Sequence, residues 1–146
     1  MRTLRKIRQK MKYSIFDKSV EVYEYDDNGD KIIDYIKKDG TIVYRTTGSV
    51  EDIYKTPVDF VASISSTLNA MHAREYSVDQ SSVYSEICVP KGYVPLKFGS
   101  KIWRKNEITW KDEDAGIPDQ ESSDYTVVGV LTEYLNFDWY LLQRNN

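Results

Sequence analysis

The chain has 146 residues, with 20 basic and 23 acidic side chains and a formal net charge of −3 at pH 7. This length is enough for one domain with a full core, in which about 70% of the unfolded surface is buried. No apolar run approaches the ~20 residues that a membrane-spanning helix needs. The single cysteine, Cys88, excludes an internal disulfide and suits a reducing compartment. A globular domain is expected.

The first twelve residues are basic, unlike the rest of the chain. They contain six Lys or Arg, whereas the remainder has 14 basic and 23 acidic side chains, a net charge of −9. We predict a basic N-terminal arm over residues 1–14 that is mobile until it docks on an acidic surface or nucleic acid; the alternative is a solubilising terminus. Helical spacing of its apolar residues would make the bound arm amphipathic. The candidate docking residues are Arg2, Leu4, Arg5, Lys6, Ile7, Arg8, Lys10, Met11 and Lys12.

Residues 15–146 are predicted to form a single mainly β domain, a small antiparallel β-barrel, which opens with a meander. Asn28 and Gly29 form one tight hairpin turn and Asp39 and Gly40 another, because these residues tolerate positive φ. A calcium loop beginning at Asp26 is excluded, since lysines stand at the sixth and twelfth positions, where Gly and Glu are needed. Alternation predicts three strands, at residues 19–25, 31–37 and 41–47.

The middle of the chain is predicted to interrupt the sheet. Residues 59–65 alternate like a strand. Residues 66–76 contain helix formers that a serine at their start would cap, so a short helix or an ordered loop is expected there. A lone histidine, His72, does not indicate a metal site. A further strand is expected at residues 83–89, with Cys88 as a small buried core residue. The candidate residues for a channel or interface role on this excursion are Asn69, His72, Arg74 and Glu75.

The last third of the chain has the pattern of the closing strands of the barrel. Gly99 and Gly129 stand where a strand would kink or bulge. Residues 111–124 are acidic, with a Gly-Ile-Pro and no histidine, which favours a solvated loop over a metal or acid–base site. Trp139 and Leu141 are expected to pack against the closing strands. The predicted strands are residues 101–103, 108–110, 125–132 and 137–143.

Catalytic motifs are not found in this sequence. It contains no phosphate-binding loop, no dinucleotide-binding glycine pattern and no nucleophile elbow. With a single histidine, most acid–base, triad and zinc mechanisms are out of reach. We therefore expect no enzymatic activity, no cofactor and no bound metal.

Three segments of the chain resemble head-completion proteins of long-tailed phages, also called stoppers or head-closure connectors. EVYEYDDNGDKIIDY resembles their opening strand pair, and AREYSVDQSSVYSEICVP resembles the segment that leads into a central strand. PLKFGSKIW and SDYTVVGVLTEYLNFDWYLLQR resemble their closing strands. The resemblance covers about residues 20–144; the basic arm, the expected helix and the acidic loop depart from the family's pattern.

The resemblance implies a virion structural protein at the head–tail junction, assembled in the host cytoplasm. It implies a ring, typically of twelve copies, between a portal or adaptor ring and the tail proteins, with no membrane contact. Packaged DNA would pass through without sequence-specific contact, because an acidic body repels phosphates. Two alternatives stay open. One is a small nucleic-acid-binding barrel with stacking aromatics, and the other is an inhibitor or immunity protein that binds a partner enzyme.

Overall fold

The computed structural model describes residues 8–145, which form two compact units. The barrel unit comprises the chain up to Phe16 and again from Tyr54, and the ribbon unit comprises Asp17–Ile53. The predicted class is confirmed, because the fold is mainly β and contains a closed antiparallel barrel with one short α-helix in its described part.

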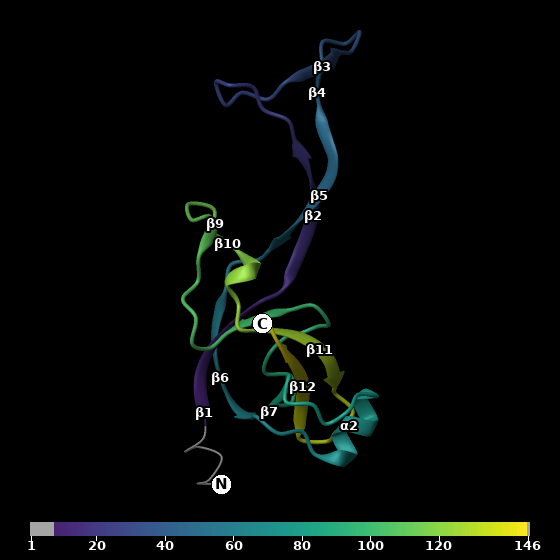
Figure 1. Ribbon diagram of the computed structural model, residues 1–146, viewed down its shortest axis with the longest axis vertical. Coiled ribbons are helices and arrows are strands. Elements are labelled where there is room, and N and C mark those ends of the chain that lie inside the picture. Colours follow the sequence, from purple (N-terminus) through teal and green to yellow (C-terminus); the bar gives the residue numbers. More distant parts are fainter. Residues whose placement is uncertain (1–7, 146) are drawn as a thin grey trace. The chain divides into compact units, whose positions relative to one another are not determined.

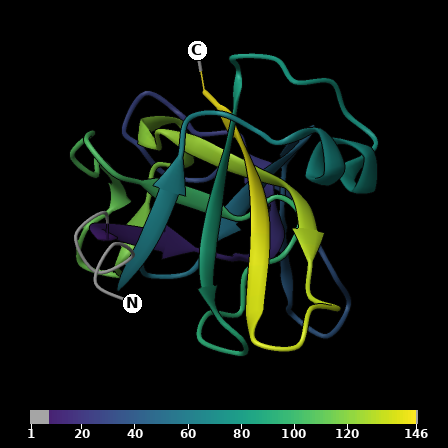
Figure 2. The ribbon, with the colours of Figure 1, turned by 90° about the horizontal axis from the view of Figure 1, so that it is seen from below.

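Six strands close the barrel in the order β1–β6–β7–β12–β11–β8, and each neighbouring pair is antiparallel. Figure 2 shows β7 in teal beside β12 in yellow, with β11 on the other side of β12. A register shift between Val127 and Gly129 confirms the bulge expected at Gly129. The barrel strands are β1 (Arg8–Ser14), β6 (Val58–Ser65), β7 (Tyr84–Pro90), β8 (Lys101–Trp103), β11 (Tyr125–Leu131) and β12 (Phe137–Arg144).

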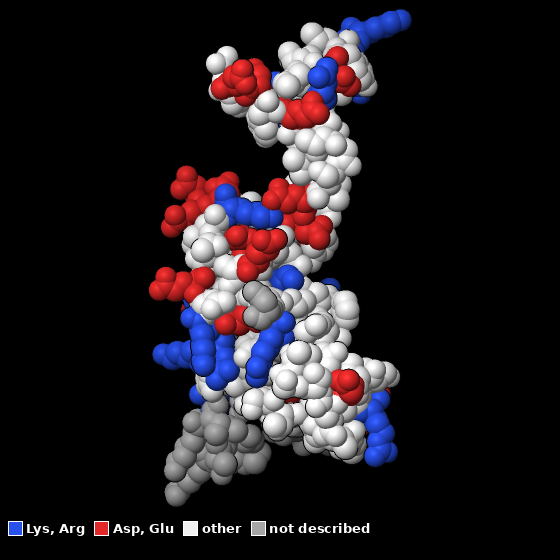
Figure 3. Space-filling model, viewed as in Figure 1, with Lys and Arg blue, Asp and Glu red and all other residues white. Residues whose placement is uncertain are grey.

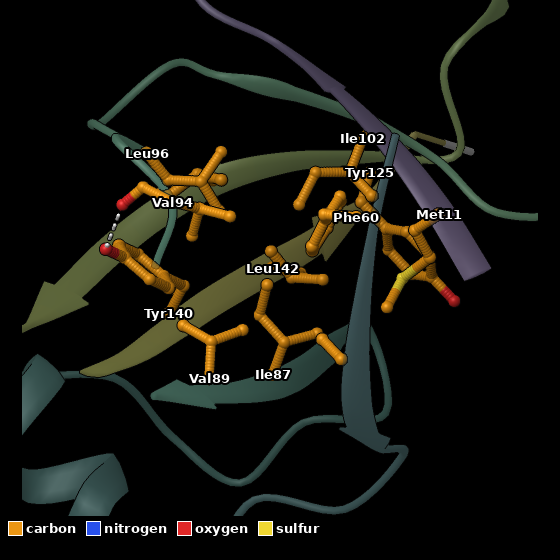
Figure 4. Close-up of a cluster of buried hydrophobic side chains, with 12 residues drawn as sticks. Met11, Phe60, Ile87, Val89, Val94, Leu96, Ile102, Tyr125, Tyr140 and Leu142 are labelled. Carbon is orange, nitrogen blue, oxygen red and sulfur yellow. Dashed lines mark hydrogen bonds between the residues drawn. The ribbon is translucent and has the colours of Figure 1, made fainter. Parts of the chain in front are cut away.

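One face of each long barrel strand fills the interior, because side chains alternate across a strand. Ile87 and Val89 of β7 meet Tyr140 and Leu142 of β12 in one buried cluster, shown in Figure 4. The Tyr140 hydroxyl donates a hydrogen bond of 3.3 Å to the Val94 carbonyl, so the one polar group of this ring is paired. The remaining buried members are Met11, Phe60, Ala62, Val94, Leu96, Ile102, Tyr125 and Val127.

A second, smaller cluster lies outside the barrel, under α2 (Ala70–Tyr76). Leu141 of β12 is buried there against Leu68 and Ala73. The expected helix is confirmed but begins later than predicted. Asn69 is its cap, and the Asn69 side chain accepts a hydrogen bond of 2.7 Å from the His72 backbone N–H. In the part of the chain that the structure describes, no helix is long and apolar enough to cross a membrane.

The ribbon unit consists of two short antiparallel pairs in succession (Figure 1). Gly29 and Gly40 have φ of +84° and +89°, and each donates its N–H across its turn, which confirms both predicted hairpin turns. The pairs are β2 (Phe16–Tyr23) with β5 (Thr46–Tyr54), and β3 (Ile33–Ile36) with β4 (Ile42–Tyr44).

The three strands predicted to open the barrel lie in this ribbon instead. Residues 19–25, 31–37 and 41–47 pair with one another and with β5, and none of them joins the barrel sheet. Alternation and turn residues specify local pairing, but they do not say which other strands a hairpin joins. The single domain expected over residues 15–146 is therefore corrected to a barrel unit and a ribbon unit.

The barrel begins inside the predicted N-terminal arm. Residues 8–14 form β1, which pairs with β6 and β8, and Met11 is only 2% exposed in the core. A mobile or helical arm is therefore wrong for Arg8, Lys10, Met11 and Lys12. The two-residue alternation of exposed lysines with Met11 is typical of a strand, and it was a better guide than the helical spacing of the apolar residues. The other candidate arm residues, Arg2, Leu4, Arg5, Lys6 and Ile7, lie outside the described residues.

The acidic stretch of residues 111–124 is only partly the solvated loop that its composition predicts. Residues 111–115 are exposed, but Pro118 and Ser123 are buried. The Asp124 carboxylate accepts three backbone N–H bonds of 2.7–3.0 Å from residues 104–106 and so anchors the loop after β8. The ordered elements here are β9 (Trp110–Asp112), β10 (Ile117–Pro118) and the 3-10 turn η1 (Gln120–Ser122).

Candidate interaction surfaces

A groove of about 730 Å³ lies on the barrel unit, where β1 and β6 face the segment that follows β8. Phe60, Val61, Trp103, Ile108 and Trp110 give it an apolar lining. Trp103 is buried, and its indole N–H donates a 2.9 Å hydrogen bond to the Ser122 hydroxyl, which fixes the floor. A volume in the range of about 300–1,000 Å³ is typical of sites that bind ligands or side chains.

The groove follows a part of the barrel where β6 has an open edge. β1 pairs with β6 along residues 8–13, whereas β6 pairs with β7 only over residues 63–65. Further along β6, the Val61 N–H donates a 3.3 Å hydrogen bond to the Tyr93 hydroxyl instead of to a strand. A partly unpaired strand edge can accept an added strand from another molecule.

Both cations and carboxylates line this groove: the cations are Lys10, Lys12 and Arg104, and the carboxylates are Asp59 and Glu107. Arg8, Lys10 and Lys12 are exposed on β1, and Lys12 forms a 3.4 Å ion pair with the exposed Asp59 across β1 and β6. Figure 3 shows Lys and Arg side chains on the face over β1 and β6. By sequence, the barrel unit has 15 basic and 13 acidic side chains, and the ribbon unit has 5 basic and 10 acidic. The formal charges of the two units are therefore +2 and −5.

The ribbon unit has no core of its own. Every residue from Asp17 to Ile53 is described, and none is buried. Its strands meet in a pair of tyrosines, Tyr23 and Tyr44, with ring centroids 6.3 Å apart, and the Lys31 ammonium lies 4.2 Å from the Tyr23 ring. Two-stranded ribbons are at best marginally stable in water. The large apolar residues that it leaves exposed are Tyr25, Ile33, Tyr35, Ile36, Ile42 and Val50.

The predicted excursion residues come together on α2 but have different surroundings. His72 is 4% exposed, and its Nδ1 lies 2.7 and 2.9 Å from the two carboxylate oxygens of Glu86. Glu75 accepts a 2.8 Å hydrogen bond from the Tyr134 hydroxyl, and Arg74 is exposed. Asn69 is the helix cap. An interface role for this group stays a prediction, and His72 has a structural role that the sequence did not suggest.

The Glu86 carboxylate also acts on its neighbours on β7 and α2. It accepts a 2.7 Å hydrogen bond from the Tyr76 hydroxyl, whose pKa is raised first by burial and then by this bond. Burial raises the pKa of the Cys88 thiol to about 11, and the carboxylates of Glu86 and Asp138 add to the effect. A protonated thiol is a poor nucleophile and metal ligand at neutral pH.

Cys88 is not the core residue that was predicted. It is half-buried on the outer face of β7, because Ile87 and Val89 on either side of it point into the barrel. Among the residues that the structure describes, no group of three or more His, Cys, Asp and Glu side chains is arranged to hold a metal ion.

The fold and these surfaces define a small antiparallel β-barrel protein that carries a ribbon without a core. No family model matches the chain, no curated protein is significantly similar to it, and no solved structure matches its fold significantly.

Proposed function

We propose that this protein is a phage virion subunit that assembles into a ring at the head–tail junction, helps to close the DNA channel and docks the tail. The observation that carries the proposal is the ribbon unit, in which no residue is buried and six large apolar side chains are exposed. Several large apolar side chains exposed on one part of a protein are typical of a surface that binds another protein. An assembly would cover them and stabilise the ribbon.

A ring requires two different surfaces on each subunit, because a head-to-tail contact closes only when one patch meets another. The groove of the barrel unit and the acidic, apolar ribbon unit are two such surfaces. The resemblance of three segments to head-completion proteins supports this particular ring, with a portal or adaptor ring on one side and tail proteins on the other. Twelve copies would be typical of that family.

The proposal is tested with phage particles assembled with and without the gene for this chain. Particles without the protein are expected to lose packaged DNA and to carry no tail, and supplying the protein in trans should restore both. Electron microscopy of complete particles should locate a tagged copy between the head and the tail. Normal DNA content and normal tails in its absence would overturn the proposal.

A second candidate function, binding of single-stranded nucleic acid, is favoured by the groove alone. Tyr93 and Trp110 are exposed beside Lys10 and Lys12, and exposed aromatics next to cations are the usual platform for stacked bases. Binding of a fluorescent oligothymidine that weakens steeply with salt and is lost in Trp110→Ala would support it. No binding at low salt would exclude it.

A further inference from the structure

We propose that the ribbon unit of one copy docks in the groove on the barrel unit of the next copy, so that copies join head to tail. This inference deepens the ring assembly proposed above and rests on it for its biological setting. It names the two surfaces that meet and gives each a chemical reason to bind the other.

The apolar part of the contact comes from the hairpin β3–β4. All four residues of β3 are exposed, and Ile33, Tyr35 and Ile36 of β3 and Ile42 of β4 are each at least 42% exposed. The groove offers the complementary apolar lining of Phe60, Ile108 and Trp110. Burying large apolar side chains away from water stabilises an interface. The hairpin therefore gains by entering the groove.

The backbone can contribute to the same contact. β6 is paired with β7 only at residues 63–65, so its earlier residues have no neighbouring strand on that side. An added strand would displace the Tyr93 hydroxyl, which accepts the Val61 N–H in the free subunit. β3 and β4 form a two-stranded pair, so each of them also has an edge without a neighbouring strand. Strand addition supplies main-chain hydrogen bonds, while the side chains on alternate positions enter pockets.

Charge favours a second copy as the occupant. The ribbon unit has a formal charge of −5, carried outside residues 33–44, where two Asp and two Lys balance. The barrel unit has a formal charge of +2, and Lys10, Lys12 and Arg104 line the groove together with the carboxylates of Asp59 and Glu107. Like-charged ribbons would repel each other, which disfavours a symmetric contact of ribbon with ribbon. Complementary charge steers association and is weakened by salt, so assembly should weaken as the salt concentration rises. Both halves of this complementary pair are present in every copy of the chain.

A mixing experiment tests the inference with the full-length chain. The groove variant is Lys10→Glu/Trp110→Ser, and the ribbon variant is Tyr35→Ser/Ile36→Ser; all four side chains are exposed. Sedimentation velocity should show each variant alone as a monomer under conditions in which the wild type assembles. Mixed together they should form a one-to-one pair and nothing larger, because only one intact ribbon and one intact groove remain.

The matched control is Lys97→Glu/Leu135→Ser, which makes the same kinds of change at exposed residues outside both surfaces and should assemble like the wild type. The inference is overturned if the mixture stays monomeric, or if the groove variant assembles normally, as it would with ribbons that bind each other or another protein. A wild-type chain that stays monomeric at its solubility limit also overturns it.

Cross-linking keeps the inference testable if one of these variants fails to fold. In a Cys88→Ser background, cysteines at Lys10 and Ile36, both exposed, would be joined with a short bis-maleimide. A ladder of linked multimers from the double-cysteine chain is expected, and chains with one cysteine should give no ladder. A product linked within one chain would show a ribbon bound to its own barrel and would overturn the inference.

The two proposals fail separately. If particles without the protein are normal but the mixed variants pair, the ring at the head–tail junction is wrong and the ribbon-to-groove contact stands. If particles need the protein but the mixed variants do not pair, the copies join through other surfaces.

Discussion

At the residue scale, Glu86 is the side chain on which the buried polar contacts of α2 converge. Its carboxylate is 2.7 Å from both His72 Nδ1 and the Tyr76 hydroxyl, and the residue is 4% exposed. Removing this acceptor leaves the polar groups of His72 and Tyr76 without their partner, which costs about 1–3 kcal/mol for each buried group. We expect Glu86→Ala to lower the free energy of unfolding by an amount of this order, measured by urea denaturation.

The control for this prediction is Glu133→Ala, an exposed carboxylate whose loss should change stability by less than about 0.5 kcal/mol. His72→Ala/Glu86→Ala should cost less than the sum of the single changes, because the two side chains interact. Strictly additive costs would show that the pair does not contribute as a unit.

Cys88 gives a prediction about pH at the same scale. Burial, and then the carboxylates of Glu86 and Asp138, raises the thiol pKa to about 11. The reactive thiolate fraction should therefore rise about tenfold for each pH unit between pH 7 and pH 10. Rates of iodoacetamide alkylation, followed by mass spectrometry, should show this rise with no plateau. A plateau below pH 9 would contradict the raised pKa. The alkylation rate of free cysteine, measured at the same pH values, is the reference.

The contacts of these side chains could not be predicted from the sequence. His72 and Glu86 are 14 residues apart on a helix and a strand, and nothing in either segment indicates that they meet. The expectation that His72 binds no metal rests on composition, since the chain has a single histidine, and it stays a prediction. The alternation that places Ile87 and Val89 inward was present in the sequence, and it would have placed Cys88 outside the core.

At the element scale, the bulge of β11 packs directly against Tyr76 of α2. A Cβ at Gly129 would lie 2.6 Å from Tyr76 Cδ1 and 3.0 Å from Leu141 Cβ. The φ of Gly129 is not positive, so steric overlap alone makes the glycine necessary. Gly129→Ala should destabilise the fold by about 1–3 kcal/mol, the usual cost of overpacking, measured by thermal unfolding.

Tyr76→Ala provides the check on this mechanism. In that background the nearest obstacle to the new methyl group is gone, so Gly129→Ala should cost clearly less than it does in the wild-type chain. An equal cost in both backgrounds would mean that the glycine is required by the backbone of the bulge and not by Tyr76.

Local patterns were a good guide to elements and a poor guide to their neighbours. The hairpin turns at Gly29 and Gly40, β8 and the last two strands were predicted nearly as they are, because alternation and turn residues act locally. The helical spacing of Leu4, Ile7 and Met11 in the sequence led to the prediction of an amphipathic arm. Residues 8–14 form the strand β1 instead, and Met11 lies in the core. The groove forms from segments far apart in the chain, so only the tertiary structure reveals it.

At the scale of the whole molecule, the barrel should fold without the ribbon. Every residue of the main core cluster belongs to the barrel unit. The two barrel segments that the ribbon connects lie close together where the ribbon begins and ends. The Lys55 N–H donates a 2.9 Å hydrogen bond to the Ile15 carbonyl, and the rings of Phe16 and Tyr54 are 6.0 Å apart. A two-residue turn can join chain ends of this kind.

We therefore expect that replacing Asp17–Ile53 with Asn-Gly leaves a barrel that unfolds cooperatively, with a midpoint within a few degrees of the full chain. The ribbon contributes no buried residue, so its loss removes little apolar burial, and a shorter connection lowers the entropy cost of closure. Calorimetry measures the midpoint, and hydrogen exchange of the full chain should show fast exchange confined to the ribbon. Loss of cooperative unfolding in the shortened chain would mean that the barrel depends on the ribbon, and the ribbon would then be part of the fold and not an element reserved for assembly.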